Sequence, residues 1–317
     1  MKKVLVTGAS GTIGLQVLRF LLSEGKYEIT AFDLKSKNVY KKLKQFRKRI
    51  NIVYGDINDG TIVDALVKDF DVVIHLAGIL PPFANANEEL VKVVDYVGTM
   101  NVCNAIKNYN PDCFLLYSSS TSVYGKQEKS DAITVTDDKN VMEEDYYSKY
   151  KLLSEDYIVN NVKNYSIFRV ANVLGDPKND ALIYNGFNDK MEFIMPEDAG
   201  YAFVNAIDNE KKINKKIFNL SGGEKYIDWY SNFILQVLKN YGLSIKYLSS
   251  ILFVEKNYYG GIYSDSGKLE NILNFRSKNI SVYYSYLQKY KVRRFIARIL
   301  ALPIVYFLQK KNDKLKK

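Results

Sequence analysis

Short apolar runs alternate with amphipathic stretches through the first half of the chain. The runs have the length of buried strands, and the stretches between them show the three- to four-residue spacing of helices. Strands joined by helical crossovers are typical of a doubly wound α/β fold with a parallel sheet. The expected strands are Lys3–Val6, Glu28–Phe32, Ile52–Tyr54, Val72–Leu76, Phe114–Tyr117 and Ser166–Val170. The expected helices are Thr12–Leu22, Thr61–Lys68, Asn87–Lys107 and Tyr147–Asn160.

Glycines at a fixed spacing follow the first expected strand, and the second strand ends at an acid, Asp33. Glycine permits a tight turn, lets the backbone approach a pyrophosphate and allows a helix to pack closely, while the helix N-terminus offers free N–H groups to the anion. An acid about 20 residues on separates such a site from an ordinary turn. We predict a dinucleotide site in a Rossmann-type sheet. Its expected contacts on this loop are Gly8, Ser10, Gly11, Thr12, Ile13 and Gly14.

The acid at the end of the second strand bears on the choice of cofactor. Asp33 would accept hydrogen bonds from the adenosine ribose and repel a 2′-phosphate, which favours NAD over NADP. Lys35 and Lys37 follow closely and could reduce that repulsion. NAD is therefore the predicted cofactor, with NADP as the less favoured alternative.

At 317 residues, the chain can form one large core and a smaller lobe, since about 150 residues make a typical domain. No Pro- or Ser-rich linker and no internal repeat divides it. We predict a Rossmann domain over residues 1–172 and a smaller C-terminal lobe, which would hold the substrate, over residues 173–288. The lobe is expected to be partly interleaved with the Rossmann core. Residues 289–317 form a basic, apolar tail.

A tyrosine and a lysine four residues apart begin the last expected helix of the first half. Tyr147 and Lys151 would share a helix face, and an ammonium beside a phenol lowers the tyrosine pKa toward the working pH of a general acid or base. The same spacing recurs at Tyr40/Lys44 and Tyr306/Lys310. Only Tyr147 follows the Ser-rich end of a core strand, so we predict that Tyr147 and Lys151 are the functional pair.

Further motifs stand at the ends of the expected strands. In the first half they are Thr7 to Gly14, Gly55-Asp56-Ile57, His75-Leu76-Ala77-Gly78, and Ser120 with Tyr147 and Lys151. In the second half they are Arg169 to Gly175, Phe193 to Ala199, Ile217 to Leu220 and Ser264 to Phe275. Together these motifs resemble those of the extended short-chain dehydrogenase/reductases, the NAD-dependent epimerase/dehydratase family.

This resemblance implies a mechanism. Tyr147 would move a proton at a substrate hydroxyl or carbonyl while a hydride passes to or from nicotinamide, Lys151 would hold the nicotinamide ribose, and Ser120 would bond the same substrate oxygen. The implied function is an epimerase or ketoreductase acting on a nucleotide- or lipid-linked sugar, as a homodimer. Further implied cofactor contacts are Asp56, Ile57, Leu76, Ala77 and Gly78. Implied substrate contacts are Ser120, Thr121, Ser122 and Asn172.

The chain departs from the family pattern at several positions. Thr121 and Ser122 stand where 4,6-dehydratases carry acids, which disfavours dehydration. Asp95 replaces the Asn of the family's Asn-x-x-Gly-Thr motif. The stretch between Asn172 and Phe193 is short, and Met191 replaces an Arg that normally grips the nucleotide diphosphate, so a standard UDP-sugar pose is not expected.

The net charge is concentrated in the tail. Residues 289–317 contain ten Lys or Arg and one acid, Asp313, and so carry +9 of the formal +10. The stretch Phe295 to Leu308 is apolar apart from Arg298 and is too short to span a membrane, which takes about 20 residues. It could lie in a membrane interface with its basic flanks near anionic headgroups. The alternative is a terminal helix docked on the lobe.

Composition excludes other classes of site. One His and two Cys, Cys103 and Cys113, supply no metal-ligand set. With no signal peptide they indicate a reducing cytoplasm. Nucleic-acid binding is not expected, because the body shows no basic stripe or binding module.

The alternative to an enzyme is an NAD-binding regulatory or scaffold protein of the same fold.

Overall fold

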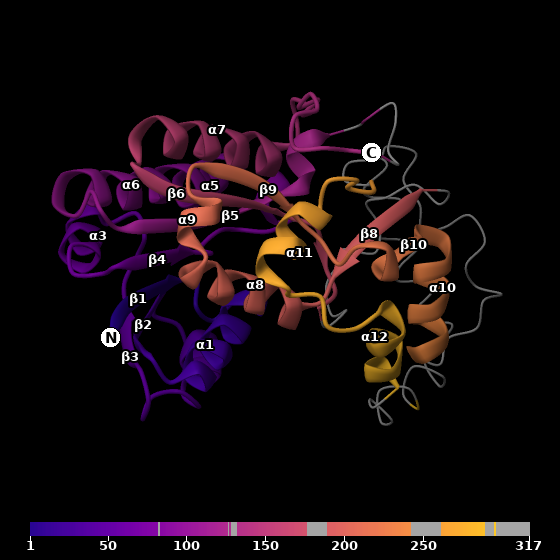
Figure 1. Ribbon diagram of the computed structural model, residues 1–317, viewed down its shortest axis with the longest axis horizontal. Coiled ribbons are helices and arrows are strands. Elements are labelled where there is room, and N and C mark those ends of the chain that lie inside the picture. The colour runs from indigo at the N-terminus through magenta and orange to yellow at the C-terminus, as the bar shows by residue number, and fades with distance from the viewer. Residues whose placement is uncertain are drawn as a thin grey trace.

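A seven-stranded parallel sheet forms the centre of the molecule (Figure 1), in the order β3-β2-β1-β4-β5-β6-β9. The computed structural model describes residues 1–81, 83–125, 127, 132–175, 189–241, 261–288 and 295. The strands are β1 (Lys2–Thr7), β2 (Tyr27–Asp33), β3 (Asn51–Tyr54), β4 (Val72–His75), β5 (Phe114–Ser120), β6 (Asn164–Val170) and β9 (Lys216–Leu220). The predicted doubly wound α/β fold is confirmed.

The strand order reverses between β1 and β4. Strands β2 and β3 follow β1 on one side of it. Strands β4, β5, β6 and β9 follow one another on the other side. The loops that follow neighbouring strands therefore part at this point and leave a crevice at the carboxyl edge, where ligands of such folds bind. The register places Thr7 beside His75 and His75 beside Tyr117, so the ends of β1, β4 and β5 lie level.

Helices cover both faces of the sheet. Helices α1, α8 and α11 pack on one face, and α3, α6 and α7 on the other. The helices are α1 (Thr12–Glu24), α2 (Lys37–Leu43), α3 (Gly60–Val67), α4 (Phe83–Ala86), α5 (Glu88–Val91), α6 (Gly98–Tyr109), α7 (Tyr146–Asn161), α8 (Pro196–Asp208), α9 (Glu210–Ile213), α10 (Tyr230–Tyr241), α11 (Gly267–Leu273) and α12 (Ile280–Leu287). Within the described residues there are also a π-helix, η1 (Lys92–Val97), and two 3₁₀-helices, η2 (Thr121–Tyr124) and η4 (Glu224–Tyr226).

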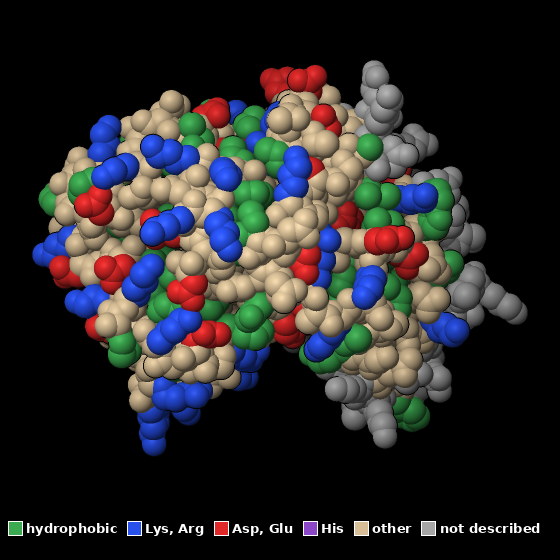
Figure 2. Space-filling view, viewed as in Figure 1, with side chains coloured by type: hydrophobic (Ala, Val, Ile, Leu, Met, Phe, Trp, Pro, Cys, Tyr) green, Lys and Arg blue, Asp and Glu red, His purple; other side chains and the backbone are tan. Residues whose placement is uncertain are grey.

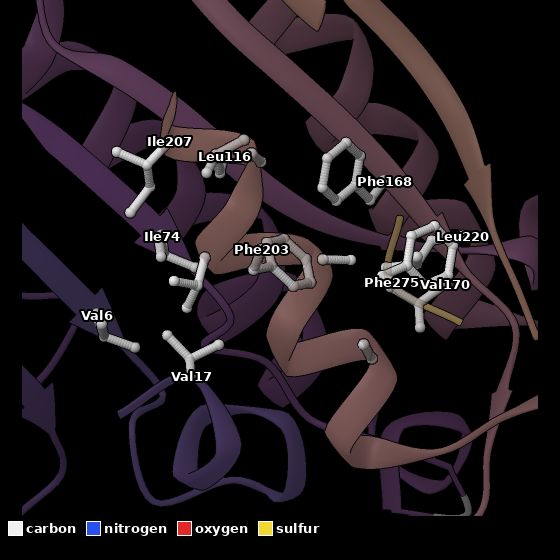
Figure 3. Close-up of a cluster of buried hydrophobic side chains, with 14 of the residues drawn as sticks. Val6, Val17, Ile74, Leu116, Phe168, Val170, Phe203, Ile207, Leu220 and Phe275 are labelled. Carbon is white, nitrogen blue, oxygen red and sulfur yellow. The ribbon is translucent and has the colours of Figure 1, made fainter. Parts of the chain in front are cut away.

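The core on the α1 side is shown in Figure 3, where Phe203 of α8 points between the strands and α1. Val6, Ile74 and Leu116 contribute from three adjacent strands, and Val17 contributes from α1. All five side chains are fully shielded from solvent. Burial on both faces explains why these strands read as near-continuous apolar runs rather than alternating ones.

A smaller sheet lies beyond the carboxyl edge of the main one. It consists of β7 (Asn172–Val173), β8 (Lys190–Ile194) and β10 (Ile227–Trp229), in the order β10-β8-β7. Helices α10 and α12 pack beside it (Figure 1) around the stacked rings of Phe193 and Phe233. Strand β9 returns to the main sheet, so the segment after residue 172 contributes to both sheets. The proposed domain boundaries stay a prediction.

Two predicted elements differ from the structure by more than two residues at an end. The single helix expected over Asn87–Lys107 is divided into α5, the π-turn η1 and α6. In η1 the Asp95 carbonyl accepts from the Thr99 and Ser154 hydroxyls, so neighbouring side chains satisfy a group that an α-helix would satisfy itself. Strand β5 runs on to Ser120 rather than ending at Tyr117, because it stays paired with β6 throughout.

Candidate active site

The glycine loop between β1 and α1 is built by close backbone contacts. Gly8 has a φ of +63°, and a Cβ there would lie 2.7 Å from the Ala77 nitrogen. A Cβ on Gly14 would lie 2.6 Å from the Gly8 carbonyl oxygen. Helix α1 begins at Thr12, and its N-cap, Gly11, has no side chain to bond the first N–H groups. N–H groups left free at a helix N-terminus are suited to binding an anion such as a pyrophosphate.

Asp33 lies against this loop. Its Oδ2 accepts from the Ser10 nitrogen at 2.8 Å, and its Oδ1 accepts from the Leu34 nitrogen at 2.8 Å. The carboxylate is thus fixed at the end of β2 beside the turn, where an adenosine ribose would lie.

The basic side chain bonded to the loop is Lys42 of α2, which donates to the Ser10 carbonyl oxygen at 3.1 Å. The sequence had suggested Lys35 and Lys37 as the residues that could reduce the repulsion between Asp33 and a 2′-phosphate. Lys42 stands three residues after buried Val39 and one before buried Leu43, and this spacing is the signal that could have found it. Residues 35–49 contain eight Lys or Arg and no acid. In Figure 2, Lys and Arg side chains gather at the lower left, below the β2–β3 edge.

His75 ends β4 and is fully buried between two threonines. Its Nδ1 lies 2.6 Å from the Thr7 hydroxyl and its Nε2 lies 3.0 Å from the Thr99 hydroxyl. Burial, and to a lesser degree the nearby charge of Lys151, lower the pKa of His75 to about 3. A neutral ring that links β1, β4 and α6 has a structural role, and no proton transfer follows from it.

Lys151 is the buried cation of the site. Its Nζ donates to the Ser118 carbonyl oxygen at 3.1 Å and lies 3.3 Å from Asp95 Oδ1. The ammonium stands over the rings of Tyr117 and Tyr147, 5.0 and 5.8 Å from their centroids. Burial lowers the pKa of Lys151. The oxygens of Tyr117, Asp95 and Tyr147 outweigh this effect, so its net pKa is raised and the ammonium persists.

Tyr147 begins the buried face of α7 that also carries Lys151. Its backbone nitrogen donates to Asn85 Oδ1 at 3.1 Å, which fixes the first turn. Burial raises the pKa of Tyr147 to about 12, although the Lys151 charge and a Ser120 hydrogen bond act to lower it. The expectation of a depressed pKa is therefore wrong, because desolvation of the phenolate exceeds its stabilisation by the ammonium.

The serine-rich end of β5 places Ser120 beside Tyr147 and Lys151. Ser120 acts on the Tyr147 phenol as a hydrogen-bond partner that lowers its pKa, and the Ser120 hydroxyl accepts from the Ser122 nitrogen at 3.1 Å. Thr121 donates to the Val170 carbonyl oxygen at 3.4 Å. The Ser122 hydroxyl is buried and has no hydrogen-bond partner among the described residues. Ser120, Tyr147 and Lys151 thus converge, while Thr121 is turned toward β6.

The other predicted contacts follow other strands: Asp56 and Ile57 come after β3, Leu76 after β4 and Asn172 after β6. Asp56 is exposed and accepts from Asn58, and Ile57 is buried against Gly98. The Leu76 nitrogen donates to the Thr7 carbonyl oxygen, which holds the β4 end against β1. Asn172 lies in β7, on the lobe side of the crevice.

The position that carries an Arg in the family pattern is part of the lobe core in this chain. Met191 lies in β8, is 1% exposed and packs in the apolar cluster around Phe193. It offers no charge to a diphosphate. The short stretch before it, residues 176–188, lies outside the described residues.

A buried ion pair holds the far end of the same α7 face. Arg169 of β6 bonds Glu155 through Nε and Nη2, the shortest contact being 2.7 Å. Tyr147, Lys151 and Glu155 follow one another at intervals of four, so one helix face bears all three. Arg169 also donates to the Tyr124 hydroxyl at 3.1 Å, which ties α7 and β6 to η2.

The sequence matches the model of the NAD dependent epimerase/dehydratase family over residues 4–183, more than half of the chain. This chain belongs to the NAD-dependent epimerase/dehydratase family. The resemblance predicted from its motifs is confirmed, and so is its class as an NAD-dependent enzyme of the extended short-chain dehydrogenase/reductase type.

The similar curated proteins include a sugar-nucleotide epimerase and a sterol dehydrogenase. CDP-paratose 2-epimerase of Salmonella typhi is 25% identical over 266 residues, which cover 69% of this chain and 79% of that protein. A decarboxylating sterol-4-alpha-carboxylate 3-dehydrogenase of Dictyostelium discoideum is 26% identical over 271 residues, which cover 80% of each chain.

Solved structures of the family share the fold. UDP-glucuronic acid 4-epimerase from Bacillus cereus, in complex with UDP-glucuronic acid and NAD, superposes with a TM-score of 0.72 at 22% identity, over 90% of this chain and 99% of that one. UDP-glucose-4-epimerase from Stenotrophomonas maltophila, with bound NAD, gives 0.74 at 17% identity over 94% of this chain and all of that one.

The site contains two polar residues whose roles sequence reasoning did not assign. Lys42 is one, and Asp95 is the other. Asp95 stood out in the sequence only as a departure from the family's Asn, and its partner Lys151 is 56 residues away. No local pattern joins positions so far apart.

Proposed function

We propose that this protein is an NAD-dependent epimerase or ketoreductase that acts on an activated sugar, nucleotide- or lipid-linked, through Ser120, Tyr147 and Lys151. The observation that carries the proposal is the convergence of these side chains beside the glycine loop, at the level edge formed by β1, β4 and β5. NAD, when bound, supplies the acceptor and donor of a hydride.

The residues of this chain would supply orientation and proton transfer. Ser120 would hydrogen-bond the substrate oxygen, and Tyr147 would take the proton from that oxygen as its carbon gives up a hydride. The same phenol would return the proton when the carbonyl is reduced. Lys151 would hold the nicotinamide ribose. A phenol with a raised pKa is protonated at neutral pH, which suits the donating step. Neither Thr121 nor Ser122 offers a carboxylate for eliminating water.

A sterol-like alcohol is a second candidate substrate. Met191 gives the lobe an apolar core where a diphosphate-gripping cation would be expected, and one relative is a sterol dehydrogenase. A sterol-like secondary alcohol would need the same Ser120 and Tyr147 chemistry and no phosphate grip.

The test is turnover with cofactor accounting. The NAD-loaded protein is incubated with a panel of UDP-, CDP- and dTDP-sugars, a polyprenyl-linked sugar and a 3β-hydroxysterol, and products are followed by NMR together with free NADH. An epimer without NADH release supports an epimerase, and stoichiometric NADH supports an oxidoreductase. Tight NAD binding with no product from any member of the panel would instead favour the regulatory or scaffold alternative.

Cofactor choice follows from Asp33. Because the carboxylate is fixed beside the ribose position, NAD should bind more tightly than NADP, and Asp33→Ser should narrow the gap by roughly tenfold or more, the value of a charge-assisted hydrogen bond. Calorimetric titration of both cofactors measures this. Lys42→Met should make NADP binding weaker than in the unmodified protein, because it removes the positive charge beside the glycine loop. Lys37→Met is the control and should leave NADP binding unchanged. Equal affinities in the unmodified protein would contradict the role of Asp33.

We further propose that residues 289–317 hold the enzyme at a membrane surface. Of this tail the structure describes only Phe295, which is exposed. Among the described residues, no helix combines the length and apolarity needed to cross a bilayer. Binding to anionic vesicles should weaken as salt screens the basic flanks, with a Debye length of about 8 Å at physiological salt, and persist in part through the apolar stretch.

The measurement for the tail is vesicle sedimentation of the full chain and of a truncation at residue 288. The truncated protein should stay in solution and still bind NAD. If the full chain does not pellet, or if truncation unfolds the protein, the tail is a docked helix. The predicted cytoplasmic location and homodimer stay predictions as well.

A further inference from the structure

Asp95 and Gly78 meet at Lys151. Asp95 stands in place of the family's Asn, and the two residues are 17 apart in sequence. A Cβ on Gly78 would lie 2.4 Å from Asp95 Oδ1 and 3.2 Å from Lys151 Nζ. The space that a methyl group at residue 78 would fill is therefore taken up by the Asp95 carboxylate and the Lys151 ammonium.

Asp95 is held so that both of its oxygens face donors. Oδ2 accepts from the Ile79 nitrogen at 2.9 Å, and Oδ1 faces Lys151 Nζ at 3.3 Å. Its carbonyl oxygen is fixed by the Thr99 and Ser154 hydroxyls, at 2.5 and 3.0 Å. The side chain is fully buried, and among the described residues Oδ1 makes no hydrogen bond, so the Lys151 ammonium is the partner that the structure gives it. This geometry fits a carboxylate paired with an ammonium.

Asp95 lies in the π-turn η1. Such turns inside helices occur often at functional sites because they realign a side chain that regular spacing would place elsewhere. Here the turn gives Asp95 access to α7, whose Lys151 is the cation of the proposed catalytic group.

We infer that Asp95 is a positioning residue for Lys151: it holds the ammonium between η1 and the end of β5 and offsets part of the charge that the ammonium presents to the Tyr147 phenol. The inference rests on the proposed acid/base role of Tyr147. A carboxylate at this place makes the phenol harder to ionise than a neutral amide would, and so favours proton donation to a carbonyl over proton removal from an alcohol.

The surroundings support this balance. The groups that face the ammonium come from four elements: His75 on β4, Tyr117 and the Ser118 carbonyl on β5, Asp95 on η1 and Tyr147 on α7. His75 is neutral at working pH, since its pKa is lowered to about 3. The negative charge of Asp95 acts to raise the pKa of Tyr147, in the direction opposite to Lys151. Burial raises the pKa of Asp95 itself, against the effects of Lys151 and the Ile79 N–H.

The test is a titration of Tyr147 that does not require turnover. Protein labelled with ¹³Cζ-tyrosine is titrated by NMR with and without saturating NAD, and the Tyr147 signal is assigned by its loss in Tyr147→Phe. Asp95→Asn keeps the size and one acceptor oxygen, and should lower the Tyr147 pKa by about one unit or more. In an oxidation assay, the limb of the pH profile that Tyr147 controls should move the same distance toward acid.

Asp156→Asn is the matched control, because it removes the same charge from an exposed position on the same helix, nine residues and about 14 Å from Tyr147. Its Tyr147 titration should match the unmodified protein. Gly78→Ala provides a second variant in case Asp95→Asn does not fold, since the added methyl displaces the carboxylate from Lys151 without removing it. It should shift the titration in the same direction by a smaller amount.

The outcomes separate the two proposals. If Asp95→Asn binds NAD normally and Tyr147 titrates within about 0.3 units of its original pKa, the role of Asp95 is overturned whatever the enzyme's activity. If Gly78→Ala alone folds and leaves the titration unmoved, the conclusion is the same. If the shift is seen but the unmodified protein converts no substrate, the positioning role stands and the proposed function fails.

Discussion

Replacing Tyr147 with Phe should reduce turnover about 10²–10⁴-fold, the usual contribution of a general acid or base, while NAD affinity changes little. The substitution removes only the phenol oxygen, and the ring keeps its buried place over Lys151. The helix start is held by the Tyr147 backbone nitrogen, which the substitution does not touch. The pyrophosphate contacts would lie on the glycine loop, on another element.

Single-turnover kinetics with the best substrate of the panel, alongside NAD calorimetry, measures this effect. Tyr150→Phe is the matched control, since it removes a hydroxyl from the same helix that bonds Glu88 at 3.0 Å instead of the catalytic group. It should retain near-normal turnover. Turnover of Tyr147→Phe within a factor of two of the unmodified enzyme would remove Tyr147 from the mechanism.

Replacing Arg169 with Met should destabilise the fold by about 3–5 kcal/mol, because it leaves Glu155 as an uncompensated buried charge. Both side chains are almost fully buried, at 3% and 2% exposed. The same change removes the Arg169 bond to the Val135 carbonyl oxygen and the one to Tyr124, whose hydroxyl in turn donates to Asn219 of β9 at 2.6 Å.

Urea unfolding followed by far-UV circular dichroism measures this loss. Lys163→Met breaks the pair of Lys163 with Asp112, which are 63% and 81% exposed, and should cost no more than about 1 kcal/mol. Adding Glu155→Met to Arg169→Met should recover much of the loss, since the lone charge is then gone. If Arg169→Met is no more harmful than Lys163→Met, the pair does not stabilise the catalytic helix.

The sequence alone determined the parallel sheet, the glycine loop with Asp33, and the placement of Tyr147 and Lys151 on one helix face. Each of these depends on short-range information. Apolar periodicity defines strands and helices, glycine spacing defines a turn, and a spacing of four defines a helix face. The predictions of the β5 end and of a single helix over Asn87–Lys107 were less accurate. Pairing with β6 extends β5, and the hydroxyls of Thr99 and Ser154 bond the Asp95 carbonyl within the helix, and both are contacts that the local sequence does not show.

Only the tertiary structure decided the electrostatics of the site. The sequence favoured a lowered Tyr147 pKa from its neighbour Lys151, but burial of the phenol reverses the net direction. Asp95 and Lys151 are 56 residues apart in sequence, and the π-turn and the space at Gly78 allow them to pair. The fold likewise places Lys42, on the helix after the second strand, against the glycine loop. Desolvation and charge pairing depend on which groups the fold brings together and how far it excludes water, and neither can be read from residue spacing.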